Sequence, residues 1–176
     1  GADPLVKQAQ MELLVSTYWN PTMDKVKEIG CQYPLTVAEL YDICINHGAE
    51  SGGGKSKGLR ELVIDADNSV GSLISGTDEE VWLNALYDAR KAYMEVDITW
   101  EQALDRIEMQ RRILNSDNLY LMVPFNVSCY GDNFIITGAN YVQNPINRRR
   151  RYSRHYSGDR SQIHRRETRP PTARSL

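Results

Sequence analysis

Asp42 is the residue of this sequence whose type and surroundings best suit acid–base chemistry. It follows Tyr41 on a predicted helix and lies beside the apolar stripe of that helix. Arg90 and Arg106 fall on the inner turns of two later predicted helices. A partly buried carboxylate held by guanidinium groups makes bidentate hydrogen bonds, and such networks fix helices together or set the ionisation of a neighbouring catalytic acid. The spacing alone favours a structural role for Asp42, in fixing helices together, over a role in setting the ionisation of a catalytic acid.

His47 is a second titratable residue with a possible chemical role, that of a general base. It ends a predicted helix just before Gly48, where a histidine more often caps the helix or packs against it. No Ser or Cys with a partner motif accompanies it, and no His and Cys residues have the spacing of metal ligands. We therefore predict neither a metal nor a cofactor. Most other carboxylates, including Glu39, are expected to be solvated.

Residues 49–56, with the sequence AESGGGKS, satisfy the loose pattern of a phosphate-binding loop. Such a loop must leave a buried strand and enter a helix whose N-terminus holds the phosphates. The segment before residue 49 instead has the periodicity of an amphipathic helix. We interpret these residues as a loop of glycines and solvated lysines.

A run of helices is predicted to position these side chains. Helix starts are marked by Asp3-Pro4, Asn20-Pro21 and two capping boxes, Thr77 with Glu80 and Thr99 with Gln102. The apolar periodicity then predicts helices over approximately residues 3–19, 20–30, 36–48, 59–66, 77–93 and 99–114. Residues 119–125 and 133–137 favour extended structure. The expected fold is all-α with a small extended or strand appendage near the end of the helical body.

The net charge of −2 hides two segments of opposite sign within the 176 residues. Residues 3–138 are predicted to form the helical domain, and residues 1–138 carry 11 Lys and Arg against 21 Asp and Glu, or −10. Residues 139–176 carry 10 Arg against two acidic residues, or +8, and lack apolar periodicity, which predicts a disordered tail. The body should attract cations and repel nucleic acid, whereas the tail suits an acidic partner.

The cysteines and the apolar segments exclude two further classes of protein. Three cysteines, Cys31, Cys44 and Cys129, cannot all pair and have no C-x-x-C spacing, so we expect buried thiols without a disulfide framework or a zinc knuckle. No apolar run reaches 18 residues, and no signal peptide is recognisable in the chain. We therefore predict no association with a membrane.

Several motifs in consistent order resemble the C-terminal part of a glycoside hydrolase family 46 chitosanase. They are DPLVKQAQ, YWNPTM, LTVAELYDICINHG, TDEEVWLNALYDARKAYM, DRIEMQRR and YGDNFIIT, from Asp3 to about Thr137. The most specific is the combination of Y-D-x-x-x-x-H-G with D-E-x-x-W-L-x-x-x-x-D-x-R about forty residues later. The resemblance implies part of a two-lobed, lysozyme-like fold. It also implies a secreted enzyme that hydrolyses the β-1,4 bonds between glucosamine residues of chitosan with inversion.

In this family a Glu protonates the leaving oxygen and an Asp activates water from the opposite side. The resemblance places both upstream of the matched region, so we expect residues 1–176 alone to be inactive or nearly so. Glu12 is the one weak candidate for the acid. Asp42, Arg90 and Arg106 match the Arg and Asp network that supports the catalytic base.

The resemblance also suggests how the chain meets its partners. Asp97, Tyr41 and His47 are the candidate substrate-binding residues, and the acidic body suits chitosan, a cationic polysaccharide. The Arg-rich tail has no counterpart in the family. An alternative is therefore a non-catalytic, degenerate chitosanase-like binding protein whose tail binds an acidic partner. Apolar surface left uncovered by a missing half would favour self-association.

Overall fold

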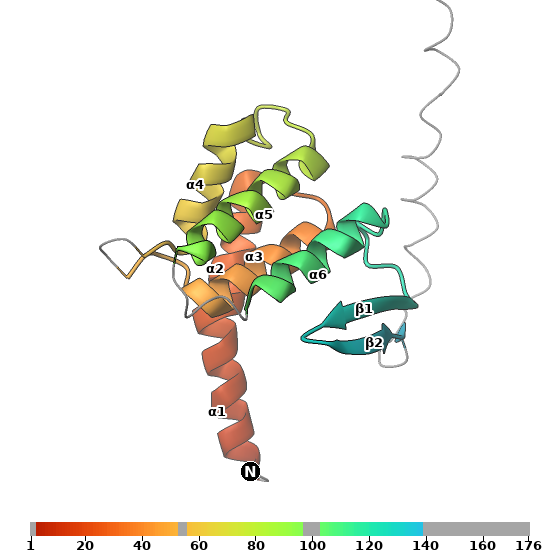
Figure 1. Cartoon of the computed structure of the whole chain (residues 1–176). Helices are drawn as coiled ribbons and strands as arrows, with labels where there is room; N and C mark the ends of the chain where they lie inside the picture. The colour runs from red at the N-terminus through yellow and green to blue at the C-terminus, as the bar shows by residue number, and fades with distance from the viewer. Residues whose placement is uncertain (1–2, 53–55, 97–102, 139–176) are drawn as a thin grey trace, which may run out of the picture. The chain divides into compact units, whose positions relative to one another are not determined.

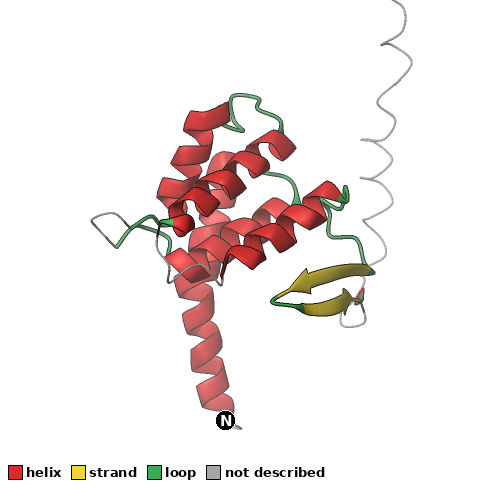
Figure 2. Cartoon of the chain, viewed as in Figure 1, coloured by secondary structure: helices red, strands yellow, loops and turns green. Residues whose placement is uncertain are grey.

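Helices make up most of the described chain, which covers residues 3–52, 56–96 and 103–138 of a computed structural model (Figures 1 and 2). These residues belong to one unit, Gly1–Gly138. The all-α body with a small strand appendage is confirmed. The predicted tail and Asp97 lie outside the described residues. The elements in chain order are α1 (Pro4–Leu14), η1 (Val15–Trp19), α2 (Asn20–Ile29), α3 (Pro34–His47), α4 (Leu59–Val70), α5 (Glu79–Glu95), α6 (Leu104–Asn115), β1 (Phe125–Cys129) and β2 (Asp132–Ile136).

The first three elements follow one another without a loop, so the predicted break at Asn20-Pro21 is wrong. η1 is a π-helical segment, and the N–H of Asn20 donates to the carbonyl of Val15, five residues earlier. Pro21 has no N–H, and its ring would clash with the carbonyl four residues before it in a regular helix. The wider π turn gives the ring room, and the helix continues to Gly30, which ends it in the left-handed conformation (φ 72°).

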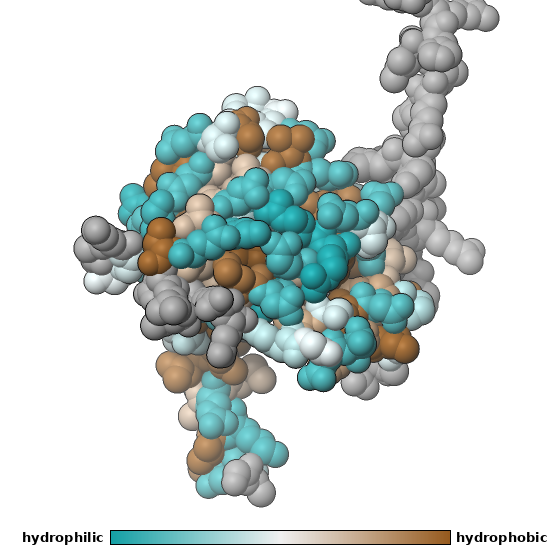
Figure 3. Space-filling model, in the orientation of Figure 1, coloured by the Kyte–Doolittle hydropathy of each residue, from teal (hydrophilic) through white to brown (hydrophobic). Residues whose placement is uncertain are grey.

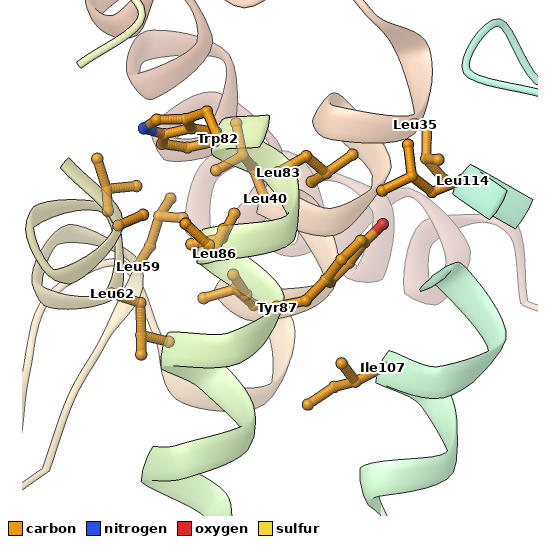
Figure 4. Packing of buried hydrophobic residues seen from close by; sticks show 14 of the residues in the cluster. Leu35, Leu40, Leu59, Leu62, Trp82, Leu83, Leu86, Tyr87, Ile107 and Leu114 are labelled. Carbon is orange, nitrogen blue, oxygen red and sulfur yellow. The ribbon is translucent and has the colours of Figure 1, made fainter. Parts of the chain in front are cut away.

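The core is built around α5, with α4 packed against it and α3 and α6 completing the cluster (Figure 4). Trp82 is fully buried, and its Nε1 donates to Asp67 Oδ1 on α4 at 2.7 Å. The apolar periodicity places Leu59, Leu62, Val63 and Ala66 on one face of α4, and all four are buried, which confirms this face. On α3 the apolar periodicity predicts a buried stripe of Val37, Leu40, Tyr41, Cys44 and Ile45. Leu40 and Cys44 are buried, but the prediction is wrong at Ile45, which is exposed, whereas Ile43 is fully buried.

The N-terminus of α5 also fixes the start of α3. Asp78, not Thr77, caps α5, and its Oδ1 accepts from the N–H groups of Glu80 and Val81. The carboxylate of Glu79 accepts from the N–H of Gln32 (2.7 Å) and of Tyr33 (2.9 Å), just before α3 begins. This contact ties the two helices that carry the predicted site. The second predicted capping box, at Thr99 and Gln102, lies outside the described residues.

The appendage is an antiparallel hairpin whose first strand packs against α6. Phe125 pairs with Ile136 in the register, and Arg112 Nη2 donates to the carbonyl of Ser128 at 2.6 Å. The extended structure predicted over residues 119–125 becomes a strand only at Phe125, where β1 begins, because a turn precedes β1. There Asn118 accepts from the N–H of Met122 (2.6 Å) and donates to its carbonyl (3.1 Å). Among the described helices, none is long and apolar enough to cross a membrane.

Candidate functional site

One side of α3 carries four polar residues that meet side chains from two other helices. Glu39, Asp42, Asn46 and His47 lie three, four and one residue apart, which places them on neighbouring turns. Arg90 reaches them from α5 and Arg106 from α6. We call these six residues the Asp42 network. Apolar residues of α3, α5 and α6 belong to one buried cluster, which brings the charges together.

Asp42 lies between the two arginines. Its Oδ2 is 2.7 Å from Arg90 Nη2, and its Oδ1 is paired with Arg106 Nη2. Asn46 donates to the same carboxylate (3.2 Å) and accepts from Arg106 Nη1 (3.2 Å). The side chain of Arg90 is fully buried, that of Asp42 is 13% exposed and that of Arg106 is 31% exposed. The network therefore runs from the core to the surface and ends there on Arg106.

Glu39 belongs to this network, so the expectation that it is solvated is wrong. It is completely buried, and its Oε1 accepts from Arg90 Nη1 at 3.0 Å. Burial raises the pKa of Glu39 despite the nearby guanidinium groups. Glu39 lies one turn before Asp42, and Leu40 and Ile43 beside it are buried. That position within an apolar face was the signal in the sequence for a buried carboxylate that needs an arginine.

Burial, together with the neighbouring Arg90, favours the neutral form of His47. Arg90 Nε donates to His47 Nε2 at 3.3 Å, and the ring meets Tyr93 edge-on with centroids 5.5 Å apart. Burial, with a smaller contribution from the charge of Arg90, lowers the pKa of His47 to about 4. A histidine with that pKa serves poorly as a general base near neutral pH.

Tyr41 lies on the more exposed side of α3, next to Asp42. Its ring meets that of Trp19 edge-on, with centroids 5.5 Å apart, and Trp19 is 43% exposed. Trp19 was not among the predicted site residues. Its proximity to Tyr41 depends on the unbroken run from η1 into α2, which the sequence analysis had divided at this point. The two rings form an aromatic pair whose Tyr41 directly precedes Asp42 on α3.

Glu12 is separate from these residues. It lies on α1, of which no residue is buried, and it accepts from Gln8 Nε2 at 2.8 Å. Asp97 lies outside the described residues. In the described part of the chain, no group of three or more His, Cys, Asp or Glu side chains could hold a metal ion.

A surface hollow of about 500 Å³ lies between α4 and α5, away from most of the Asp42 network. Asp65 and Asp88 contribute carboxylates to it, and Tyr93 contributes an aromatic ring. Both carboxylates are already paired, Asp65 with Lys57 and Asp88 with Arg111. Among the predicted site residues that the structure describes, none lines this hollow, but its Tyr93 contacts the ring of His47.

Comparison with known proteins identifies the family of the helical body. A family model for glycosyl hydrolase family 46 matches residues 1–125. The chain belongs to this family. A chitosanase from a Streptomyces species is 28% identical over 135 residues, which are 76% of this chain and 47% of the relative. The family membership predicted from the sequence motifs is confirmed.

Solved structures of family relatives share the fold. A native chitosanase from Bacillus subtilis superposes with a TM-score of 0.71 at 26% identity, over 77% of this chain and 58% of that one. A family 46 chitosanase from Gynuella sunshinyii, solved with chitotetraose, gives 0.71 at 30% identity, over 76% and 57%. A mutant of the B. subtilis enzyme was solved with six GlcN units. This chain thus spans about half the length of the relatives it matches.

Proposed function

We propose that this chain forms the C-terminal part of a chitosanase-type glycoside hydrolase, which cuts β-1,4 bonds between glucosamine residues inside chitosan with inversion of configuration. The observation that carries the proposal is the Asp42 network in a chain of family 46. A chitosan-degrading hydrolase meets its polymeric substrate outside the cell, so we also propose that the protein is secreted.

The network would support the catalytic base by supplying a fixed positive charge. Asp42 and Asn46 hold Arg106 at the surface end of the network, where its side chain is 31% exposed. A guanidinium beside a carboxylate stabilises its charged form and lowers its pKa, which keeps a catalytic base ionised at mildly acidic pH. Arg90 and Glu39 anchor Asp42 from the core side. In this proposal these residues position groups and do not themselves exchange protons with substrate.

We propose that residues 1–176 do not contain the catalytic pair. An inverting glycosidase needs two carboxyl groups about 6.5–9.5 Å apart, one of them kept protonated by its surroundings. Glu12 is exposed on α1, with Gln8 as its hydrogen-bond partner, and this exposed position does not provide an apolar environment that would favour the protonated acid. The approximate half-length match to the relatives is consistent with two carboxylates supplied by other residues.

Substrate binding would use Tyr41 and His47, together with Asp97. The Tyr41 ring, paired with Trp19, suits a sugar face, and the surplus of acidic residues in the body favours a polyamine. Solved relatives hold chitotetraose or six GlcN units, which makes a glucosamine oligomer the ligand of choice for a test.

The test combines a cleavage assay with a binding assay. Incubation of the chain with chitosan should yield essentially no new reducing ends, whereas robust cleavage would refute the absence of the catalytic pair. Titration with a glucosamine hexamer should show weak binding that Tyr41→Ala reduces. Tyr130→Ala, which removes an exposed tyrosine on the hairpin turn, is the matched control and should bind like the wild type. No binding, or equal loss in both variants, would contradict the proposed site.

A further inference from the structure

Four buried side-chain atoms of α3, α5 and α6 have no hydrogen-bond partner among the described residues. They are Thr36 Oγ1 and Glu39 Oε2 on α3, Tyr87 Oη on α5 and Gln110 Oε1 on α6. Thr36, Glu39 and Tyr87 are fully buried, and Gln110 is 5% exposed. On the hydrophilic outer faces of α5 and α6 (Figure 3) polar groups can bond to solvent. A polar group in the interior needs a partner there, because burial without a hydrogen bond destabilises the fold.

The four atoms come from neighbouring turns of the three helices. Thr36 and Glu39 lie three residues apart, and therefore on the same face of α3. Burial, followed by the charge of Glu39, raises the pKa of Tyr87, so the phenol lies near that carboxylate and keeps its proton. The guanidinium of Arg111, the residue after Gln110, lies 5.3 Å from the centre of the Tyr87 ring. Glu39 and the turn of α6 that carries Gln110 thus both lie near Tyr87.

The direction of the Tyr87 hydroxyl agrees with this placement. In Figure 4 it points toward the side of the core where Leu35 of α3 and Leu114 of α6 lie. Leu35 directly precedes Thr36, and Leu114 lies about one turn after Gln110. Helix α6 contacts both α3 and α5. The hydroxyl is therefore directed into the junction of the three helices.

The hydrogen-bonding capacities of the four atoms match those of one water molecule. The hydroxyl groups of Thr36 and Tyr87 can each donate, whereas the oxygens of Glu39 and Gln110 accept. We propose that a single water molecule is bound at this junction, where it accepts from Thr36 and Tyr87 and donates to Glu39 Oε2 and Gln110 Oε1. Buried waters typically make two to four hydrogen bonds to such otherwise unsatisfied groups.

This water joins α6 to the buried end of the Asp42 network. Glu39 Oε1 accepts from Arg90 Nη1 at 3.0 Å, and the water fixes the second oxygen of the same carboxylate. The inference does not depend on the proposed hydrolase function. Because the four atoms are already buried, it also does not depend on what covers the surface of the body.

Oxygen-17 magnetic relaxation dispersion of the whole chain tests the proposal, because it counts waters that stay bound for longer than the protein tumbles. Thr36→Val with Tyr87→Phe removes both donors and should lose one long-lived water relative to the wild type. The matched control, Thr22→Val with Tyr93→Phe, removes the same two kinds of hydroxyl and should keep the wild-type count. Thr22 is also fully buried, but its hydroxyl already donates to the carbonyl of Tyr18 at 2.7 Å. Circular dichroism checks that both variants fold.

A crystal structure of the wild type provides a second test that needs no variant. We expect density for one water within hydrogen-bond distance of all four atoms. A direct hydrogen bond from Tyr87 to Glu39 or Gln110, with no water between them, would overturn the proposal. An unchanged count of long-lived waters in Thr36→Val with Tyr87→Phe would do the same, and an equal loss in the control would show that the effect is not specific to this junction.

Discussion

Removing the carboxylate of Asp42 should destabilise the body strongly. Asp42→Ala deletes the group that pairs with Arg90 and Arg106 and accepts from Asn46. Breaking a buried ion pair by removing one partner typically costs about 3–5 kcal/mol, because the other charge stays buried and uncompensated. Asp42 keeps some contact with solvent, and Arg90 retains Glu39 as a partner, so the lower end of this range applies. We expect a loss of about 3 kcal/mol.

Urea unfolding followed by far-UV circular dichroism measures this loss directly. With a denaturant slope of about 2 kcal/mol per molar urea, a loss of 3 kcal/mol lowers the midpoint by about 1.5 M. Asp88→Ala is the matched control, because it also removes an aspartate that pairs with an arginine. Its side chain is 71% exposed, however, and lies 2.7 Å from Arg111 Nη2. Exposed pairs contribute little, so the control midpoint should barely change.

An Asp42→Ala midpoint equal to that of Asp88→Ala would refute the reasoning. It would mean that the guanidinium of Arg90 finds compensation without Asp42, and that Asp42 does not connect the three helices energetically. Asp42→Asn keeps the shape of the side chain and removes its charge, and should fall between the wild type and Asp42→Ala. If it matched Asp42→Ala, the charge would account for the whole effect.

Two further predictions concern pH. The pKa of His47 is lowered to about 4 from an ordinary value of 6.5, so as pH falls through this window the unfolded chain takes up a proton that the folded chain does not. The stability advantage of the wild type over His47→Gln should therefore shrink between about pH 6.5 and pH 4, and a constant difference in urea midpoint would contradict this. The pKa of Glu39 is raised above its ordinary 4.5, so above that pH the folded chain keeps a proton that the unfolded chain has lost. The stability advantage therefore changes with pH in the direction opposite to that expected for His47. The advantage of the wild type over Glu39→Gln should shrink as pH rises above 4.5, and a growing advantage would show that Arg90 outweighs burial.

Much of the helical body could be predicted because local pattern and tertiary packing agree there. Trp82 and Leu86 lie four residues apart on α5, and both are fully buried, as an inward-facing stripe requires. The four residues of the α4 face behave in the same way. The family motifs could be recognised in the sequence because they combine such buried apolar positions with the charged residues of the Asp42 network. Element type followed from periodicity wherever one face of a helix meets the core.

The errors arose where a single residue type was taken to decide the local structure. Asn20-Pro21 reads as a helix start, but a π turn absorbs the proline within a continuous helix. Leu119–Phe125 has β-forming residues, but the side chain of Asn118 closes a turn on Met122. Apolar periodicity does not report hydrogen bonds within a turn. It also does not report a helical turn that contains one extra residue. Both features depend on backbone geometry that the pattern does not specify.

Glu39 was misjudged because carboxylates are usually solvated, and its burial depends on an arginine 51 residues later in the chain. The same pairing changes what the network can do. Glu39 and Asp42 together balance Arg90 and Arg106, so the buried part carries no uncompensated charge when both acids are ionised. Because the exposed end of the network is a guanidinium, a carboxylate that approaches Arg106 meets a positive charge held in place by Asp42 and Asn46. Protonation of Glu39 would leave Arg90 to pair more fully with Asp42 and would leave Arg106 less well compensated, which strengthens its attraction for such a carboxylate. The buried glutamate thus connects the ionisation of the core to the electrostatic potential at the proposed site.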